Sequence, residues 1–168
     1  MKNLCRVVLC TLLCAGTIFS ASQSVAARLN VVLIVADDLG WGELGCYGQQ
    51  KIPTPNIDRL AVSGQRFTQF YSGAPVCAPS RCVLMTGLHL GHAEIRGNRQ
   101  AKTVFPEYDE GQYPIQSETI TFPELLQHAG YATGAMGKWG LGPVGSTGDP
   151  NNQGFDSSFF VARMTVFS

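Results

Sequence analysis

Unbroken apolar runs and amphipathic stretches succeed one another along this chain, and each type predicts a different element. Residues 29–36 (LNVVLIVA) form a run rich in β-branched side chains, which is typical of a strand buried on both faces of a parallel sheet. Residues 66–72 (RFTQFYS) and 131–136 (YATGAM) are predicted to be further strands, the second of them buried. The pattern therefore indicates an α/β fold with a mostly parallel central sheet.

Two amphipathic stretches between these runs carry helix start and stop signals. The first helix is predicted to begin at Pro55 and to end at Gly64. Its predicted buried face consists of Ile57, Leu60 and Ala61. The second begins at the capping box Thr121-x-x-Glu124 and ends at Gly130. Its apolar stripe consists of Leu125, Leu126 and Ala129.

A third helix is predicted over residues 80–86, shortly after Cys77. Pro79 suits the first turn of a helix, and Gly87 lies where a left-handed C-cap falls. Cys77 therefore lies at a helix N-terminus, where unpaired N–H groups and the dipole favour negative charge, and Arg81 adds a positive charge near the same face. The sequence predicts an anion site here. The alternative is a half-buried structural cysteine before an ordinary surface helix.

The ends of the predicted strands carry further candidate chemistry. Asp37 and Asp38 follow the first strand, and ligands gather beyond the carboxyl ends of strands in open α/β sheets. Adjacent carboxylates repel unless a cation lies between them, and oxygen ligands favour Ca²⁺ or Mg²⁺. Lys138, between glycines after the strand at 131–136, is predicted to reach a bound anion at the same end of the sheet. The alternatives are an Asp-rich turn and a solvated loop lysine.

The loops on either side of residue 100 contain weaker candidates for metal-binding or anion-binding residues. His89 and His92 lie in residues 88–98, which are predicted to be a solvent-exposed loop, because no third ligand follows with the spacing of a zinc site. Arg96 in the same loop is a candidate for assisting anion binding. Residues 102–116 are predicted to be a polar surface insertion.

Residues 1–27 differ in character from the rest of the chain. Two basic residues precede an apolar run over residues 7–19, and small residues follow as far as Ala27. This pattern predicts a secretory signal peptide cleaved after Ala27, or alternatively after Ala26, because the run is shorter than the roughly 20 residues that span a bilayer. We therefore expect an exported, periplasmic or extracellular protein with no membrane attachment after cleavage.

The net charge limits the classes of binding partner, and the cysteine content limits the possible disulfides. Twelve basic and twelve acidic residues give a formal net charge of zero, which offers no electrostatic case for a nucleic-acid or anionic-membrane partner. Signal cleavage leaves Cys46, Cys77 and Cys82, an odd number for an exported protein. If Cys77 is modified, the other two form one potential pair or two buried thiols. A disulfide between Cys77 and Cys82 is the alternative.

The motif C-x-P-S-R, formed by residues 77–81 and followed by an apolar run and Thr-Gly, resembles the signature of the sulfatase family. Members of this family carry a formylglycine made by oxidising this cysteine. The resemblance extends over about residues 30–160 and includes Asp37 and Asp38, residues 137–142 (GKWGLG) and residues 153–156 (QGFD). The chain departs from the family at Gly140, where many members carry a histidine that contacts the sulfate or the formylglycine.

The resemblance implies an alkaline phosphatase-like sulfatase fold, of which residues 28–168 are the N-terminal part of the catalytic domain. It implies a sulfate ester as substrate and a formylglycine-generating or sulfatase-maturing enzyme as partner. By analogy, the hydrated aldehyde from Cys77 presents a metal-activated hydroxyl that attacks sulfur, and its second hydroxyl later expels sulfate. Asp37, Asp38 and the modified Cys77 would hold Ca²⁺ or Mg²⁺. Arg81 would stabilise the formylglycine, and Lys138 would neutralise charge on the transferring group.

Two other functions remain open at the level of the sequence. A phosphatase or phosphodiesterase of the same superfamily would use a serine or threonine nucleophile in place of Cys77. A non-catalytic exported fragment is the alternative from another class, because sulfatases are much longer than 168 residues and carry further metal ligands, a later lysine and a later histidine. We expect a truncated gene product or partial reading frame, and we expect this chain by itself to be inactive.

Overall fold

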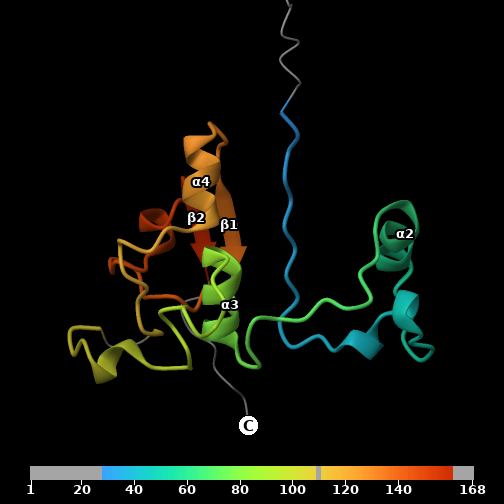
Figure 1. Cartoon of the computed structure of the whole chain (residues 1–168), viewed down its shortest axis with the longest axis horizontal. Helices are drawn as coiled ribbons and strands as arrows, with labels where there is room; N and C mark the ends of the chain where they lie inside the picture. Colours follow the sequence, from blue (N-terminus) through green and yellow to red (C-terminus); the bar gives the residue numbers. More distant parts are fainter. Residues whose placement is uncertain (1–27, 109–110, 161–168) are drawn as a thin grey trace, which may run out of the picture. The chain divides into compact units, whose positions relative to one another are not determined.

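The computed structural model describes residues 28–108 and 111–160 (Figure 1). The chain divides into two units, Met1–Ala36 and Asp37–Ser168. The signal peptide predicted over residues 1–27 lies outside the described residues. Among the helices that the structure describes, none is both long enough and apolar enough to cross a bilayer.

The segment before Asp37 does not form the predicted strand. Residues 28–36 have no regular secondary structure and are exposed throughout, with Ile34 84% exposed, so the prediction of a buried strand at 29–36 is wrong. Residues 66–72 likewise form no strand, and their aromatic side chains are exposed. Apolar, β-branched composition favours a strand only where a neighbouring strand pairs with it. The sheet in the described part of the chain has two strands, and neither segment pairs with it.

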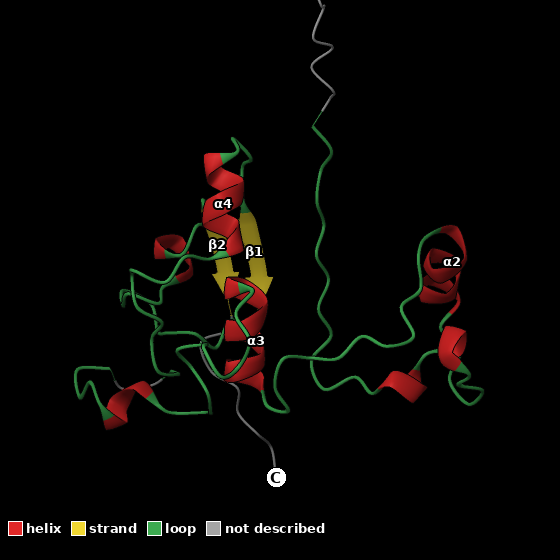
Figure 2. Cartoon of the chain, viewed as in Figure 1, coloured by secondary structure: helices red, strands yellow, loops and turns green. Residues whose placement is uncertain are grey.

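The three predicted helices are present (Figure 2). Helix α2 spans Pro55–Ser63, α3 spans Cys77–Thr86 and α4 spans Phe122–His128. Within the described residues, four short 3-10 helices accompany them: η1 (Trp41–Glu43), η2 (Gly45–Tyr47), η3 (Ala101–Thr103) and η4 (Pro150–Asn152).

The helix ends show how far local signals determine these elements. The predicted C-cap of α3 is confirmed, because Gly87 adopts a φ of 67°, in the left-handed region that favours glycine. The predicted cap of α4 is also present, since the backbone N–H of Thr121 donates to Glu124 Oε2 at 2.7 Å. Helix α4 ends at His128, two residues before the predicted end at Gly130.

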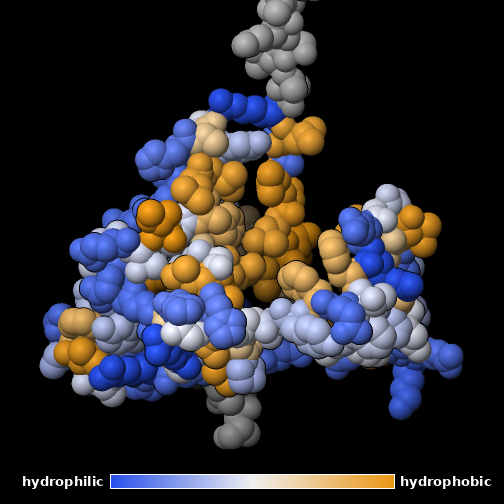
Figure 3. Space-filling model, viewed as in Figure 1, coloured by the Kyte–Doolittle hydropathy of each residue, from blue (hydrophilic) through white to orange (hydrophobic). Residues whose placement is uncertain are grey.

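The predicted buried faces of α2 and α4 are largely exposed. Leu60 of α2 is 68% exposed and Leu125 of α4 is 60% exposed. Ile57 is also exposed, whereas Leu126 is half-buried. Figure 3 shows exposed hydrophobic side chains on the face that it presents. The 3.6-residue period predicted the helices correctly, but burial also needs a packed neighbour.

The sheet consists of β1 (Gly134–Gly137) and β2 (Ser157–Phe160), which pair in parallel with Met136 opposite Phe159. The predicted strand at 131–136 is therefore confirmed as a parallel strand, although it starts three residues later. It is not buried, because Met136 is 84% exposed. Lys138 follows the end of β1 directly, as predicted.

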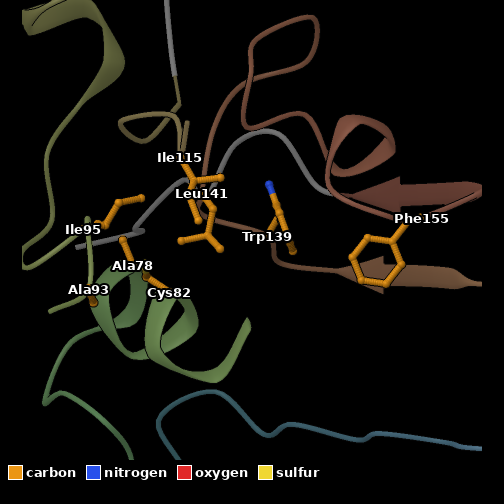
Figure 4. Close-up of a cluster of buried hydrophobic side chains, with 8 residues drawn as sticks. All are labelled: Ala78, Cys82, Ala93, Ile95, Ile115, Trp139, Leu141 and Phe155. Atoms are coloured by element: carbon orange, nitrogen blue, oxygen red, sulfur yellow. The ribbon is translucent and has the colours of Figure 1, made fainter. Parts of the chain in front are cut away.

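One hydrophobic core joins α3, the loop after it and the segment after β1 (Figure 4). Its buried side chains are Ala78, Cys82, Ala93, Ile95, Ile115, Trp139, Leu141 and Phe155. The ring of Trp139 packs edge-on against Phe155, with centroids 5.8 Å apart, and its Nε1 donates to the carbonyl oxygen of Gly148 at 2.7 Å. This core fixes α3 and the segment that carries Lys138 against each other.

Two predicted surface loops contribute to this core. Ala93 and Ile95 in residues 88–98 are buried, and Ile115 in residues 102–116 is fully buried. The predictions of an exposed loop and a polar insertion are therefore wrong at these positions. Single apolar residues between polar neighbours show no periodicity, but they become buried when the loop folds back over a helix.

A polar clamp joins the two segments that lead into the strands. Asp156 Oδ2 accepts a hydrogen bond from the backbone N–H of Thr133 at 2.7 Å, and Asp156 Oδ1 accepts one from Gln127 Nε2 at 2.7 Å. The backbone N–H of Asp156 in turn donates to Thr133 Oγ1 at 3.0 Å. Thr133 and Asp156 precede β1 and β2, so the clamp fixes the register of the parallel pair.

The clamp makes stability depend on pH through Asp156. Hydrogen bonds from the backbone and side chain of Thr133, and then from Gln127, hold the pKa of this carboxyl below its usual value. A depressed carboxyl pKa stabilises the fold above the unfolded pKa of about 3.9, and this stabilisation is lost as pH falls through the folded pKa. We expect the stability lost in Asp156→Asn to be constant above about pH 5 and to shrink below about pH 4. Urea titrations at several pH values measure it. Glu118→Gln, at an exposed carboxylate, is the control, and a pH-independent loss in Asp156→Asn would contradict the assignment.

Candidate active site

Cys77 is the first residue of α3, so the predicted placement of this cysteine at a helix N-terminus is confirmed. Val76 at the N-cap is extended and provides no side-chain hydrogen bond. The thiol of Cys77 is free, and so are those of Cys46 and Cys82, so the alternative disulfide between Cys77 and Cys82 is not formed. Cys82 is buried in the core, whereas Cys77 and Cys46 are half-buried.

Three of the predicted site residues meet at one point. Arg81 Nη2 lies 2.9 Å from Asp37 Oδ1, and Lys138 Nζ lies 2.7 Å from Asp37 Oδ2. Arg81 Nη1 also donates to the backbone carbonyl of Lys138. The structure therefore brings together residues from the end of the first apolar run, from α3 and from the segment after β1.

The electrostatics of this cluster follow from the two cations. The Lys138 hydrogen bond holds the pKa of Asp37 below its usual range, against a smaller opposing effect of burial, and Arg81 acts in the same direction as Lys138. Burial disfavours the charged form of Lys138, but the Asp37 hydrogen bond and the charges of Cys77 and Asp37 outweigh it and raise the pKa of Lys138. Lys138 therefore stays charged near neutral pH and acts electrostatically on Cys77.

The Cys77 thiol has a neighbour that the sequence analysis did not identify. Asn98 Nδ2 lies 3.4 Å from Cys77 Sγ, and Asn98 Oδ1 accepts a hydrogen bond from the backbone N–H of Ala78 at 3.1 Å. Burial raises the pKa of the Cys77 thiol, but the Asn98 contact, the Lys138 charge and backbone N–H groups together lower it below its ordinary value. The absence of a capping side chain at Val76 is the sequence signal that a residue elsewhere supplies the cap.

The remaining candidate residues lie differently. Asp38 is exposed, has a φ of 55° and makes no side-chain hydrogen bond or ion pair with any described residue. Arg96 Nε donates to the carbonyl of Ala93 at 3.0 Å, which places its stem on the loop after α3. Gly140 has a φ of 80°, and a Cβ built on it would lie 3.4 Å from Arg81 Cδ. Position 140 therefore faces Arg81, so a side chain there would contact the cluster.

The donor atoms of the site suit a hard cation only in part. Carboxylate oxygens are the donors that Ca²⁺ and Mg²⁺ prefer, but Ca²⁺ takes about 6 to 8 of them. Both oxygens of Asp37 are engaged by Arg81 and Lys138. Within residues 28–108 and 111–160 no group of three or more His, Cys, Asp and Glu side chains is placed to hold a metal ion. Asp37 and Asp38 thus fit part of a ligand shell.

The site suits an anion more directly. Arg81 Nε is buried and has no hydrogen-bond partner among the described residues. A buried donor of a charged guanidinium is costly to leave unpaired, so an oxygen acceptor here would be strongly favoured.

Asn98 also lines a cavity of about 440 Å³, together with Glu94, Ile95, Arg96, Gly97, Arg99 and Tyr113.

Comparison with known proteins gives a consistent result. The Sulfatase family model matches residues 29–166. Human arylsulfatase A is 44% identical over 138 residues, which cover 81% of this chain and 26% of that protein. The N-acetylgalactosamine-6-O-sulfatase of Bacteroides thetaiotaomicron is 42% identical over 141 residues, which cover 79% of this chain and 26% of that protein. The chain spans about a quarter of the length of the curated relatives it matches.

Solved structures agree with these sequence matches. A Bacteroides thetaiotaomicron structure, described in connection with the metabolism of multiple glycosaminoglycans, has a TM-score of 0.64 and 36% identity over 76% of this chain and 27% of that one. The crystal structure of Ps i-CgsB with k-i-k-neocarrahexaose has a TM-score of 0.64 and 34% identity over 77% of this chain and 27% of that one.

Proposed function

This chain belongs to the sulfatase family, and from that premise we propose that it carries the nucleophile-bearing part of an exported sulfuric ester hydrolase. The reaction converts a sulfate ester and water into an alcohol, sulfate and a proton. The observation that supports this proposal best is the meeting of Asp37, Arg81 and Lys138 beside Cys77 at the N-terminus of α3. Arylsulfatases and N-acetylgalactosamine-6-sulfatases are among the relatives, which supports the reaction class.

We assign Cys77 as the residue that a formylglycine-generating or sulfatase-maturing enzyme oxidises. The hydrated aldehyde would supply the nucleophilic hydroxyl in the mature protein. The backbone N–H groups of Cys77 and Ala78 at the start of α3 favour negative charge at this position. Cys77 is half-buried, whereas Cys82 is sealed in the core, so of the two cysteines of α3 Cys77 is the one placed to act on a ligand.

Arg81 and Lys138 hold the anionic group of the ester in this proposal. The buried Nε of Arg81 has no partner in the part of the chain that the structure describes, so it can donate to an oxygen of the sulfate group or of residue 77. Lys138 is charged and acts electrostatically on Cys77, so it can neutralise charge that develops on the transferring group. Asp37 and Asp38 would contribute to holding Ca²⁺ or Mg²⁺, which would supply further charge neutralisation when bound.

A direct test of this function is the fate of Cys77. When the chain is coexpressed with a formylglycine-generating enzyme, we expect the peptide that contains Cys77 to change mass by the difference between a CH₂SH and a CHO group. Cys46 and Cys82 lie outside the motif and serve as internal controls that keep their thiols. Mass spectrometry of a Cys77→Ala variant fixes the background, and only unmodified or disulfide-linked Cys77 in the unsubstituted chain would falsify the assignment.

The second candidate function is a non-catalytic exported fragment that binds anions weakly. It is favoured by the engagement of both Asp37 oxygens with cations and by the partial metal shell. The two functions differ in turnover, because a non-catalytic fragment would not hydrolyse a sulfate ester.

A further inference from the structure

Helix α3 begins without a capping side chain of its own. Val76 offers no acceptor, Pro79 in the first turn has no N–H group, and Ser80 N donates to Val76 O at 3.2 Å. The N–H of Ala78 is therefore one of the donors that the start of the helix leaves to a partner elsewhere in the chain.

Asn98 provides that partner from 20 residues away. Its Oδ1 accepts from the N–H of Ala78 at 3.1 Å. Because only the oxygen of an amide accepts a hydrogen bond, this contact fixes the orientation of the group. Nδ2, which carries the donors, is then held 3.4 Å from Cys77 Sγ. Oδ1 also lies 3.6 Å from Sγ and accepts from the thiol when it is protonated. One side chain thus caps the helix and places both a donor and an acceptor beside the γ atom of residue 77.

The loop that carries Asn98 is anchored to the same helix. Ala93 and Ile95 are buried against Ala78 and Cys82 of α3 (Figure 4). Burial raises the pKa of the Cys82 thiol, against a smaller opposite effect of the backbone N–H groups of Ile95 and Glu94, so this loop lies beside α3. Asn98 itself is exposed, so its position depends on the packing of Ala93 and Ile95 on α3.

We propose that Asn98 is a positioning residue, which orients the side chain of residue 77 by accepting from Ala78 N–H and donating to the γ atom of residue 77. In the converted protein, which rests on the proposed function, the γ atom is the oxygen of the hydrated aldehyde. Donation from Nδ2 would favour the hydrate, the form that offers a hydroxyl, over the free aldehyde.

Two substitutions of Asn98 in the full chain separate the role of its acceptor, Oδ1, from the role of its donor, Nδ2. Asn98→Asp keeps an oxygen for Ala78 N–H but has no N–H group near neutral pH. Asn98→Leu has a similar size and offers neither. We expect amide exchange of Ala78 to rise about tenfold in Asn98→Leu and to stay within about twofold in Asn98→Asp.

The readout for the donor is the side chain of residue 77 itself. In the unconverted protein, three-bond couplings across the Cα–Cβ bond of Cys77 should show a single side-chain rotamer. In both Asn98 variants the same couplings should show averaging over several rotamers. After conversion, oxime formation with hydroxylamine should be about fivefold faster in both variants, because less of the aldehyde is hydrated. Asn56→Asp and Asn56→Leu, at an exposed position of α2, are the matched controls and should change neither readout.

A purely structural cap would give a different pattern. If Asn98→Asp matched the unsubstituted chain in the couplings and in oxime formation, Asn98 would act only as a helix cap and the proposal would be overturned. Unchanged Ala78 exchange in Asn98→Leu would overturn it as well. Failure to convert Cys77 would count against the proposed function instead, and the couplings in the unconverted chain would still decide this inference.

Discussion

Gly148→Ala is expected to lower the free energy of unfolding by about 3 kcal/mol, because no room for a methyl group exists at this position. A Cβ built on Gly148 would lie 2.0 Å from Leu141 O and 2.9 Å from Ile115 N. These two atoms hydrogen-bond each other at 2.8 Å. Both side chains are fully buried, so the backbone cannot move aside without disturbing the core.

The same substitution threatens a second contact. Trp139 Nε1 donates to the carbonyl oxygen of Gly148, and a shift of the backbone at Gly148 would leave this buried donor without its partner. Urea unfolding followed by tryptophan fluorescence measures the loss and its denaturant midpoint. Gly42→Ala is the control, because a Cβ at Gly42 meets no atom within 4 Å. A loss below about 1 kcal/mol in Gly148→Ala would mean that the segment around it is not packed as described.

Local signals predicted the elements of this fold better than they predicted burial. The cap at Thr121, the terminating Gly87 and the start at Pro55 depend on residues within one turn of a helix, and all three are confirmed. The strand at 29–36 required pairing partners that its own residues cannot specify. Hydrophobic pattern alone therefore assigned burial to residues that the described part of the chain leaves exposed.

The candidate site was predictable in composition but not in arrangement. Cys77 and Arg81 lie four residues apart on one helix, so their proximity followed from helical geometry. Asp37 was expected at a sheet edge beside Lys138, and the two do meet, although no strand forms before Asp37. Asp37 and Lys138 are held together by an ion pair, and Asp37 also pairs with Arg81 of α3. Their proximity therefore does not depend on two neighbouring strands of one sheet.

Asn98 escaped prediction because its contacts are not local. Nothing in residues 88–98 shows that the loop returns to the start of α3, since that path depends on the burial of Ala93 and Ile95. A helix cap supplied from a distant loop has no fixed spacing that a sequence motif could record.

The chain by itself, with Cys77 converted and Ca²⁺ or Mg²⁺ added, is expected to hydrolyse an aryl sulfate no faster than its Cys77→Ala variant. Asp37 and Asp38 offer few of the roughly 6 to 8 oxygens that Ca²⁺ takes. Lys138 and Arg81 also compete for Asp37, with Nζ 2.7 Å and Nη2 2.9 Å from its two oxygens. Added Ca²⁺ should therefore bind weakly and leave residue 77 without its main activating charge.

Catalytic groups that act as a unit lose almost the whole rate enhancement when several are missing, rather than a proportional share. The relatives are about three times as long as this chain, so a longer protein that contains these residues provides the positive arm of the test. There, Cys77→Ala and Asp38→Ala should each reduce the initial rate by at least about a thousandfold. Turnover by the chain alone, above its Cys77→Ala control, would contradict this prediction. Either the five residues Cys77, Arg81, Lys138, Asp37 and Asp38 would then suffice, or a second chain would supply the missing ligands. Analytical ultracentrifugation of the active sample separates these two outcomes.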